Sequence, residues 1–116
     1  MNRTSKLFAV SVLLTTGSAL AQSTCERPAA VAIPDGSNAT LDQMLEAQSG
    51  VRDYLAAMET YLECMDDVIE SATEDTAPET RNTWVTDYNA AVDEMEATAT
   101  RFNEERVAYQ RANPAD

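Results

Sequence analysis

The chain of 116 residues has no histidine and few basic residues, a single lysine, Lys6, and seven arginines against 20 aspartates and glutamates, so its formal net charge is −12. The lack of histidine excludes histidine-based acid–base or nucleophilic catalysis. The shortage of basic residues excludes a nucleic-acid-binding protein, which needs a basic surface to meet the phosphates. A chain of this charge is also repelled by anionic lipid surfaces.

Long hydrophobic runs are also missing. The longest apolar stretch, residues 7–14, is too short for a transmembrane helix, which takes about 20 residues. It follows Arg3 and Lys6 and precedes Ala19-Leu20-Ala21, the order of a secretory signal peptide and its cleavage site. We expect residues 1–21 to be removed, leaving 95 residues with six arginines, no lysine and a formal charge of −14. This predicts one small periplasmic or secreted domain with no membrane insertion after cleavage.

Cysteine is scarce as well, with Cys25 and Cys64 as the only two. In an exported chain such a pair favours one intramolecular disulfide, and the spacing does not match a Cys-x-x-Cys redox motif. Two free or intermolecular thiols remain an alternative interpretation. Lipidation of Cys25 is another, although Gln22-Ser23-Thr24 does not resemble a lipobox.

Few glycines and prolines interrupt the rest of the chain, and their positions divide it into segments. Residues 22–39 contain the turn signal Pro34-Asp35-Gly36 and predict an extended arm that ends in a turn. Residues 40–73 and 77–112 carry apolar side chains in steps of three and four, which is typical of packed helices. The short connection between these helices predicts an antiparallel hairpin. The fold class is therefore predicted as all-α, a long two-helix hairpin with an N-terminal arm stapled by one disulfide.

Capping signals and the apolar seams set the expected register. Thr40 with Gln43 and Thr76 with Glu79 predict capping boxes at the two helix starts. The predicted seam of the first helix is Leu41, Met44, Gln48, Val51, Leu55, Met58, Leu62, Met65, Ile69 and Ala72. That of the second is Val85, Tyr88, Val92, Met95, Ala99, Phe102, Arg106 and Tyr109. A turn near 73–76 would place Gln48 opposite Phe102, whereas a register shifted by one heptad would place Leu55 there.

One flank of the first helix carries no charged residue and predicts an apolar groove along the hairpin. The predicted groove residues are Tyr54, Tyr61, Val68, Trp84 and Ala91. They are either a surface for a partner or, as we favour, the packing surface for the arm. In the second case the arm turns back at Pro34-Asp35-Gly36 and brings Cys25 to Cys64, and Gly50 gives its backbone room.

Candidate metal ligands are limited to carboxylates and methionines. Met44, Met58, Met65 and Met95 lie on the seams, where core packing is more typical than copper(I) binding. The carboxylates form no calcium-binding loop with a glycine turn, so a solvated acidic face is the better interpretation. We therefore predict no metal, no cofactor and no enzymatic activity.

The predicted function is a non-enzymatic protein that interacts with proteins or peptides, holdase-like or structural. Its acidic faces would attract a cationic peptide or protein partner, and it would be a monomer or a weak homodimer. The alternative is a periplasmic metal-binding protein that uses carboxylates or methionines.

Several short motifs carry a resemblance: Cys25-x-x-Pro28, Pro34-Asp35-Gly36, Tyr61-Leu62-Glu63-Cys64 and Tyr88-Asn89-Ala90-Ala91-Val92. In these motifs the chain resembles a group of small exported proteobacterial helical proteins of unknown function. The resemblance implies that the cysteines, the turn and the tyrosines serve the scaffold. It implies no activity, cofactor or partner.

Overall fold

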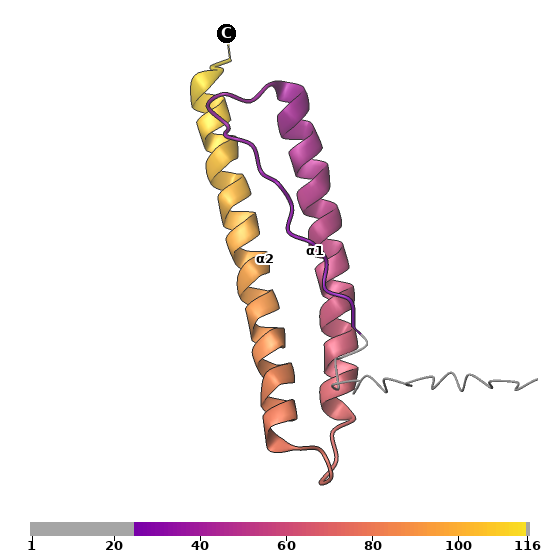
Figure 1. The fold of residues 1–116 in the computed structure, drawn as a ribbon. Coiled ribbons are helices and arrows are strands. Elements are labelled where there is room, and N and C mark those ends of the chain that lie inside the picture. Colours follow the sequence, from indigo (N-terminus) through magenta and orange to yellow (C-terminus); the bar gives the residue numbers. More distant parts are fainter. Residues whose placement is uncertain (1–24, 116) are drawn as a thin grey trace, which may run out of the picture.

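The computed structural model describes residues 25–115, which form two long antiparallel helices and an extended arm (Figure 1). Helix α1 comprises Leu41–Glu70 and helix α2 comprises Pro78–Ala112. No strand occurs within the described part of the chain. This confirms the predicted all-α hairpin, while the predicted signal peptide lies outside the described residues.

Helix α1 begins with the predicted capping box. The Thr40 hydroxyl accepts a hydrogen bond from the Gln43 backbone N–H at 3.2 Å, and the Gln43 side chain accepts one from the Thr40 N–H at 2.9 Å. The helix ends at Glu70, earlier than the predicted residue 73. It ends there because the Ser71 hydroxyl bonds back to the Val68 carbonyl and the following threonines form a turn of their own.

The predicted capping box of α2 is wrong. The Thr76 hydroxyl accepts a hydrogen bond from the Thr73 N–H at 3.0 Å, inside the connection between the helices, so it does not cap α2. Ala77 is the residue at the cap position and makes no side-chain bond there. Pro78 in the first turn lowers the cost, because it has no N–H that needs a partner.

The buried face of α1 is rotated from the predicted seam toward the arm. Its buried residues are Met44, Ala47, Val51, Tyr54, Met58, Tyr61 and Met65. The predicted seam residues Leu41 and Gln48 are exposed instead, and Leu55 and Leu62 are half-buried. Helix α2 is rotated in the same sense, since Ala91 is its one buried residue and Val85 is exposed. A seam between two helices alone would bury both rows, so the rotation reflects a third packing element.

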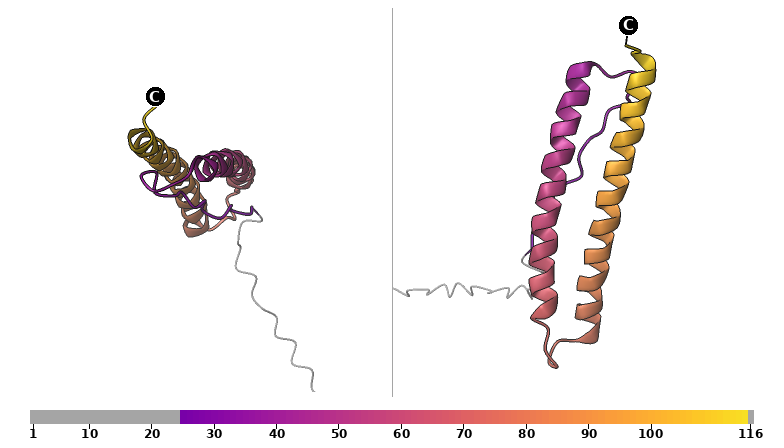
Figure 2. Two further views of the ribbon diagram at one scale, coloured as in Figure 1. Left: turned by 90° about the horizontal axis from the view of Figure 1, so that it is seen from above. Right: turned by 180° about the vertical axis from the view of Figure 1, so that it is seen from behind.

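That third element is the arm, which runs along one side of the hairpin (Figures 1 and 2). The core cluster of Tyr54, Met58, Tyr61, Met65 and Ala91 packs against arm residues as well as against the partly buried side chains of both helices. On the side without the arm, Gln48 and Phe102 line a common hollow, as the predicted register places them.

Candidate functional site

The candidate site is the groove between α1 and α2 that the arm occupies. At one end of the arm, Cys25 and Cys64 form a disulfide with their Cα atoms 5.7 Å apart. The arm therefore runs along α1 from the turn at Pro34-Asp35-Gly36 to Cys64, which lies in the last two turns of the helix, as predicted. Both cysteines are bonded to each other, so the alternative of two free or intermolecular thiols does not describe this structure.

The central part of the arm packs on small residues of α1. A Cβ atom at Gly50 would lie 3.1 Å from Cγ2 of Val31, so Gly50 makes room for an arm side chain and not for the arm backbone. Val31 also packs against the buried cluster. Shallow hollows flank the arm, one between Ile33, Ala47 and Gly50 and one near the disulfide. Each is open and lined mainly by small apolar groups.

The turn of the arm is fixed to α2 through its backbone. The Gly36 N–H donates a hydrogen bond to Oε2 of Glu105 at 2.6 Å, and Gly36 is buried. The turn is closed internally, because Asp35 accepts hydrogen bonds from the Ser37 N–H at 3.0 Å and from the Asn38 amide at 2.7 Å. The Pro34-Asp35-Gly36 turn thus joins the arm to the far end of α2 before the chain enters α1.

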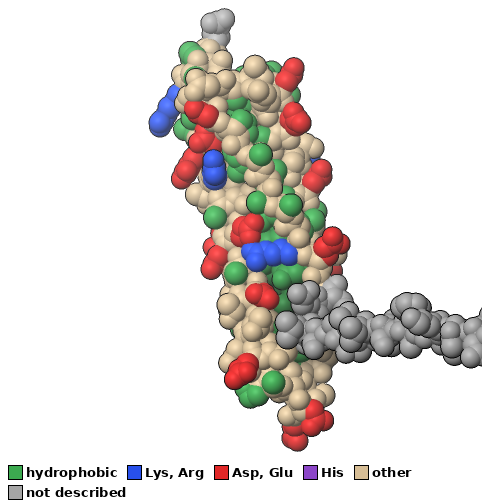
Figure 3. Space-filling model, in the orientation of Figure 1, with side chains coloured by type: hydrophobic (Ala, Val, Ile, Leu, Met, Phe, Trp, Pro, Cys, Tyr) green, Lys and Arg blue, Asp and Glu red, His purple; other side chains and the backbone are tan. Residues whose placement is uncertain are grey.

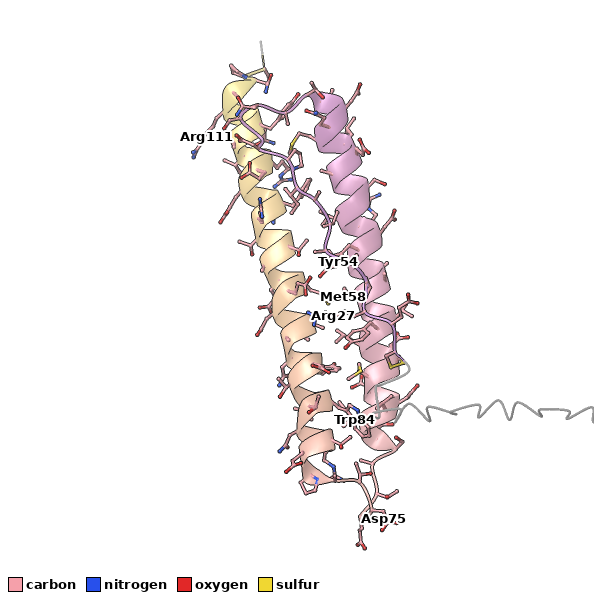
Figure 4. The ribbon with its side chains drawn as sticks, viewed as in Figure 1. Arg27, Tyr54, Met58, Asp75, Trp84 and Arg111 are labelled. Atoms are coloured by element: carbon pink, nitrogen blue, oxygen red, sulfur yellow. A yellow bond between two sulfur atoms is a disulfide. The ribbon has the colours of Figure 1, made fainter. Side chains whose placement is uncertain are left out.

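A charged contact joins the arm to the middle of α2. The Arg27 guanidinium donates to the Glu94 carboxylate, and Figure 4 shows Arg27 beside Tyr54 and Met58. The pKa of Glu94 is lowered, first by the neighbouring Tyr54 hydroxyl and then by Arg27. This is the one ion pair within residues 25–115.

The two groove tyrosines are buried. Burial is the main cause that raises the pKa of both Tyr54 and Tyr61, and the carboxylates of Glu94 and Asp87 raise them further. The Tyr54 hydroxyl has no partner at hydrogen-bond distance, although Glu94 lies close enough to affect its pKa. Neither phenol is set up as an acid or base at neutral pH, because both remain protonated there.

The structure places the five predicted groove residues along the line of the hairpin, with different exposure. Tyr54, Tyr61 and Ala91 are buried in the core cluster, and Trp84 and Val68 are half-buried. Trp84 packs against the cluster. Of the two interpretations, the packing surface for the arm describes this arrangement, and a partner would reach the tyrosines only after the arm had left.

Potential metal ligands do not gather in the described residues. No group of three cysteine, aspartate or glutamate side chains is arranged to hold a metal ion within residues 25–115. Met58 and Met65 are fully buried in the core, and Met44 is buried as well. The methionines therefore pack the core, where the thioether fills irregular space.

Charge on the surface is distributed unevenly. On the side that carries the arm, apolar side chains gather along the middle, whereas acidic side chains lie along both edges and beside a basic side chain halfway along the face (Figure 3). No helix in the described residues is both long and apolar enough to cross a bilayer.

Comparisons of this chain with protein-family models, with curated proteins and with solved structures find no match.

Sequence reasoning missed three residues that hold the arm: Arg27, Glu94 and Glu105. Arg27 is the one basic residue of the arm, and in an acidic chain this could have predicted that it pairs with a carboxylate of the hairpin. Glu94 and Glu105 were not distinguishable from the many other carboxylates of α2, because their role depends on where the arm crosses that helix.

Proposed function

We propose that this chain is an exported, non-enzymatic helical protein that binds basic peptides or basic protein surfaces reversibly through its acidic exterior. Export is supported by the secretory pattern of residues 1–21 and by the disulfide, which is typical of oxidising compartments. The expected location is the periplasm or the extracellular medium. The resemblance to small exported proteobacterial proteins agrees with this proposal and adds no partner to it.

The observation that carries the proposal is the uncompensated acidic charge. Within residues 25–115 a single carboxylate, Glu94, is paired with an arginine. Exposed carboxylates cover the outer side of α1, among them Asp53, Glu63 and Asp67. Such a field speeds the encounter with basic partners and depends strongly on salt. The alternative is that the acidic charge only keeps the protein soluble. In that case a basic partner is attracted by the charge alone and makes no further specific contact.

The arm shows what kind of chain the hairpin accepts. It is an extended, mainly apolar segment that crosses the groove with one arginine placed against a carboxylate. A peptide with basic and small apolar residues would meet the same chemistry on the rest of the surface. We therefore expect unfolded or flexible basic segments as partners, which corresponds to a holdase-like role.

Fluorescence anisotropy with a labelled peptide of alternating arginine and alanine tests the proposal on the exported, oxidised protein. We expect binding that weakens with salt, with a measurable part of the affinity left at about 0.5 M, where the Debye length is about 4 Å. A peptide in which glutamate replaces arginine is the matched control and should not bind. Equal binding of both peptides, or loss of all affinity at high salt, would contradict a binding role.

Variants of the outer side of α1 locate the effect. Replacing Asp53 and Asp67 by asparagine should weaken binding several-fold, because each exposed charge contributes up to about 1 kcal/mol. Replacing Ala56 and Thr60 by glutamine alters the same side without changing its charge and should leave the affinity unchanged. If both double variants behave alike, the acidic exterior is not the binding surface.

A further inference from the structure

The side of the hairpin opposite the arm carries an apolar strip of one row on each helix, interrupted by Gln48 and Arg106 and flanked by two mainly polar rows. We define the open face by four rows in seven-residue steps, two on each helix. They run from Leu41 to Ile69 and from Leu45 to Asp66 on α1, and from Val85 to Arg106 and from Asn82 to Asn103 on α2. The hollow between Leu41, Gln48 and Phe102 contains no arm residue, whereas the hollow over Ala47 and Gly50 does. Figure 2 likewise places the arm on one side of the helix pair.

Large apolar side chains of the open face are in contact with solvent. Leu41 is 56% exposed, Leu45 is 52% exposed and Val85 is 41% exposed. Leu55 and Leu62 of the same strip are half-buried at the edge of the helix contact. Exposed apolar rows that continue along two packed helices are typical of an interaction surface.

The charge of the open face identifies its occupant. Its rows contain two arginines and three carboxylates, a net charge of −1, although the chain without residues 1–21 carries −14. A surface for a cationic partner would hold a large share of that negative charge. A nearly neutral face suits a partner that has a nearly neutral face of its own and is acidic elsewhere. When two such faces meet, the acidic surfaces of the two molecules point away from each other.

We propose that this partner is a second copy of the chain and that two open faces pack antiparallel to form a four-helix bundle with both arms outside. A two-fold axis across Leu55 places Leu41 over Ile69 of the second copy and Gln48 over Leu62 of the second copy. In the register that places Gln48 opposite Phe102, Leu55 lies opposite Met95 in the same hairpin. Met95 therefore lies beside the same two-fold axis. The α2 row is then also symmetric, with Val92 over Ala99 of the second copy, as an isologous interface requires.

The row that begins at Leu45 supplies charge complementarity. One turn to either side of the axis lie Arg52 and Glu59, both exposed in the single chain. The antiparallel arrangement brings Arg52 of each copy to Glu59 of the other, so the pair forms twice. The neighbouring row of α2 contributes asparagines at positions 82, 89 and 103, which add no repulsion, and Glu96, which lies beside the axis and close to Glu96 of the second copy. This one like-charged pair opposes association, so the dimer depends on the apolar rows and on the two Arg52–Glu59 pairs.

Sedimentation equilibrium of the exported, oxidised protein tests the proposal over micromolar to millimolar concentrations. We expect a monomer–dimer equilibrium that shifts toward the dimer as salt screens the acidic exteriors. Arg52→Glu should weaken the dimer about tenfold, because it turns two attractive contacts into repulsive ones. The variant with both Arg52→Glu and Glu59→Arg should restore the dimer, because each exchanged pair is complementary again and the net charge is that of the wild type.

Glu59→Arg alone separates this interface from a general effect of charge. It makes each copy less negative, so relief of repulsion alone predicts a tighter dimer, whereas the proposed pair predicts a weaker one. Asp53→Arg makes the same change of charge on the outer side of α1 and should tighten association slightly. Circular dichroism checks that each variant folds, which is expected because all three positions are exposed. A monomer at every concentration, or equal behaviour of Glu59→Arg and Asp53→Arg, would overturn the proposal.

Discussion

Gly36 of the arm lies directly against the backbone of Glu105 in α2. A Cβ atom at position 36 would lie 1.8 Å from the Glu105 carbonyl oxygen and 2.9 Å from the backbone nitrogen of Tyr109. Backbone atoms of a helix cannot move aside without breaking the helix, so only glycine fits here. The contact ties the start of α1 to the end of α2 and makes the arm part of the core.

Gly36→Ala should therefore loosen the turn from α2. We expect a loss of about 1–3 kcal/mol, because overpacking against a fixed backbone forces the two segments apart. The hydrogen bond from the Gly36 N–H to Glu105 would be lost with it. Urea unfolding followed by circular dichroism measures the loss.

Gly50→Ala is the control for this prediction. Its added methyl group would lie 3.1 Å from Cγ2 of Val31, so the arm needs to shift by only a few tenths of an ångström to accept it. The helical position also gains about 0.5–1 kcal/mol from the higher helix propensity of alanine. We expect a stability close to that of the wild type, and a Gly50→Ala variant that is less stable than Gly36→Ala would contradict the account of both glycines.

Removing the disulfide should release the other end of the arm. Cys25 and Cys64 close a loop with a sequence separation of 39, so Cys64→Ser is expected to lower the free energy of unfolding by about 4 kcal/mol on chain-entropy grounds. That is a large share of the stability of a small domain. Thermal unfolding of the oxidised wild type and the variant checks this, and equal melting temperatures would show that the arm needs no staple.

The sequence was sufficient to predict the architecture because the relevant signals are local or periodic. Steps of three and four gave two helices, Thr40 and Gln43 gave the start of α1, and the short connection gave the antiparallel hairpin. The uncharged flank and the cysteine positions predicted that the arm lies along α1. These features depend on residues close in the chain or on one repeated spacing.

The rotation of both helices and the attachment of the arm to α2 were not predictable in the same way. A seam drawn for two helices favours Leu41 and Val85, and both are exposed because the arm draws the buried face toward itself. Glu94 and Glu105 acquire their roles only from the path of the arm. Thr76 illustrates the reverse case, since a competing turn with Thr73 takes the hydroxyl that a capping box would need.

Acid should weaken the attachment of the arm in the middle of the hairpin. The pKa of Glu94 is lowered in the folded protein, by the Tyr54 hydroxyl first and by Arg27 next. A lowered folded pKa contributes stability at pH values above the unfolded pKa, and this contribution is lost as the pH falls through the folded pKa. The free energy of unfolding should therefore decrease below about pH 4.5, the ordinary range of a glutamate carboxyl.

Glu94→Gln tests the source of this decrease. It removes the titrating group, so the acid limb of the stability curve should be shallower than in the wild type. Asp93→Asn removes a neighbouring exposed charge that makes no hydrogen bond to the described part of the arm, and is the matched control. If the free energy of unfolding decreases equally with falling pH in the two variants, the contact of Glu94 with Arg27 and Tyr54 does not contribute to the acid dependence of stability.

Tyr54→Phe should keep or raise the stability at neutral pH, although it alters a core residue. The Tyr54 hydroxyl is buried without a partner at hydrogen-bond distance, so its removal gains up to about 1 kcal/mol, less the stability that it contributes by lowering the pKa of Glu94.

At alkaline pH the difference in the free energy of unfolding between Tyr54→Phe and the wild type should widen. Burial raises the pKa of Tyr54 above 10.0, so the unfolded chain ionises first and the wild type loses stability as the pH rises through the folded pKa. The Tyr54→Phe variant lacks the decrease in stability that is due to Tyr54. It keeps the decrease that is due to Tyr61, whose pKa is raised as well. Urea unfolding at neutral pH and above pH 10 measures both effects, and a destabilised Tyr54→Phe at neutral pH would mean that the hydroxyl is bonded, with Glu94 as the acceptor at hand.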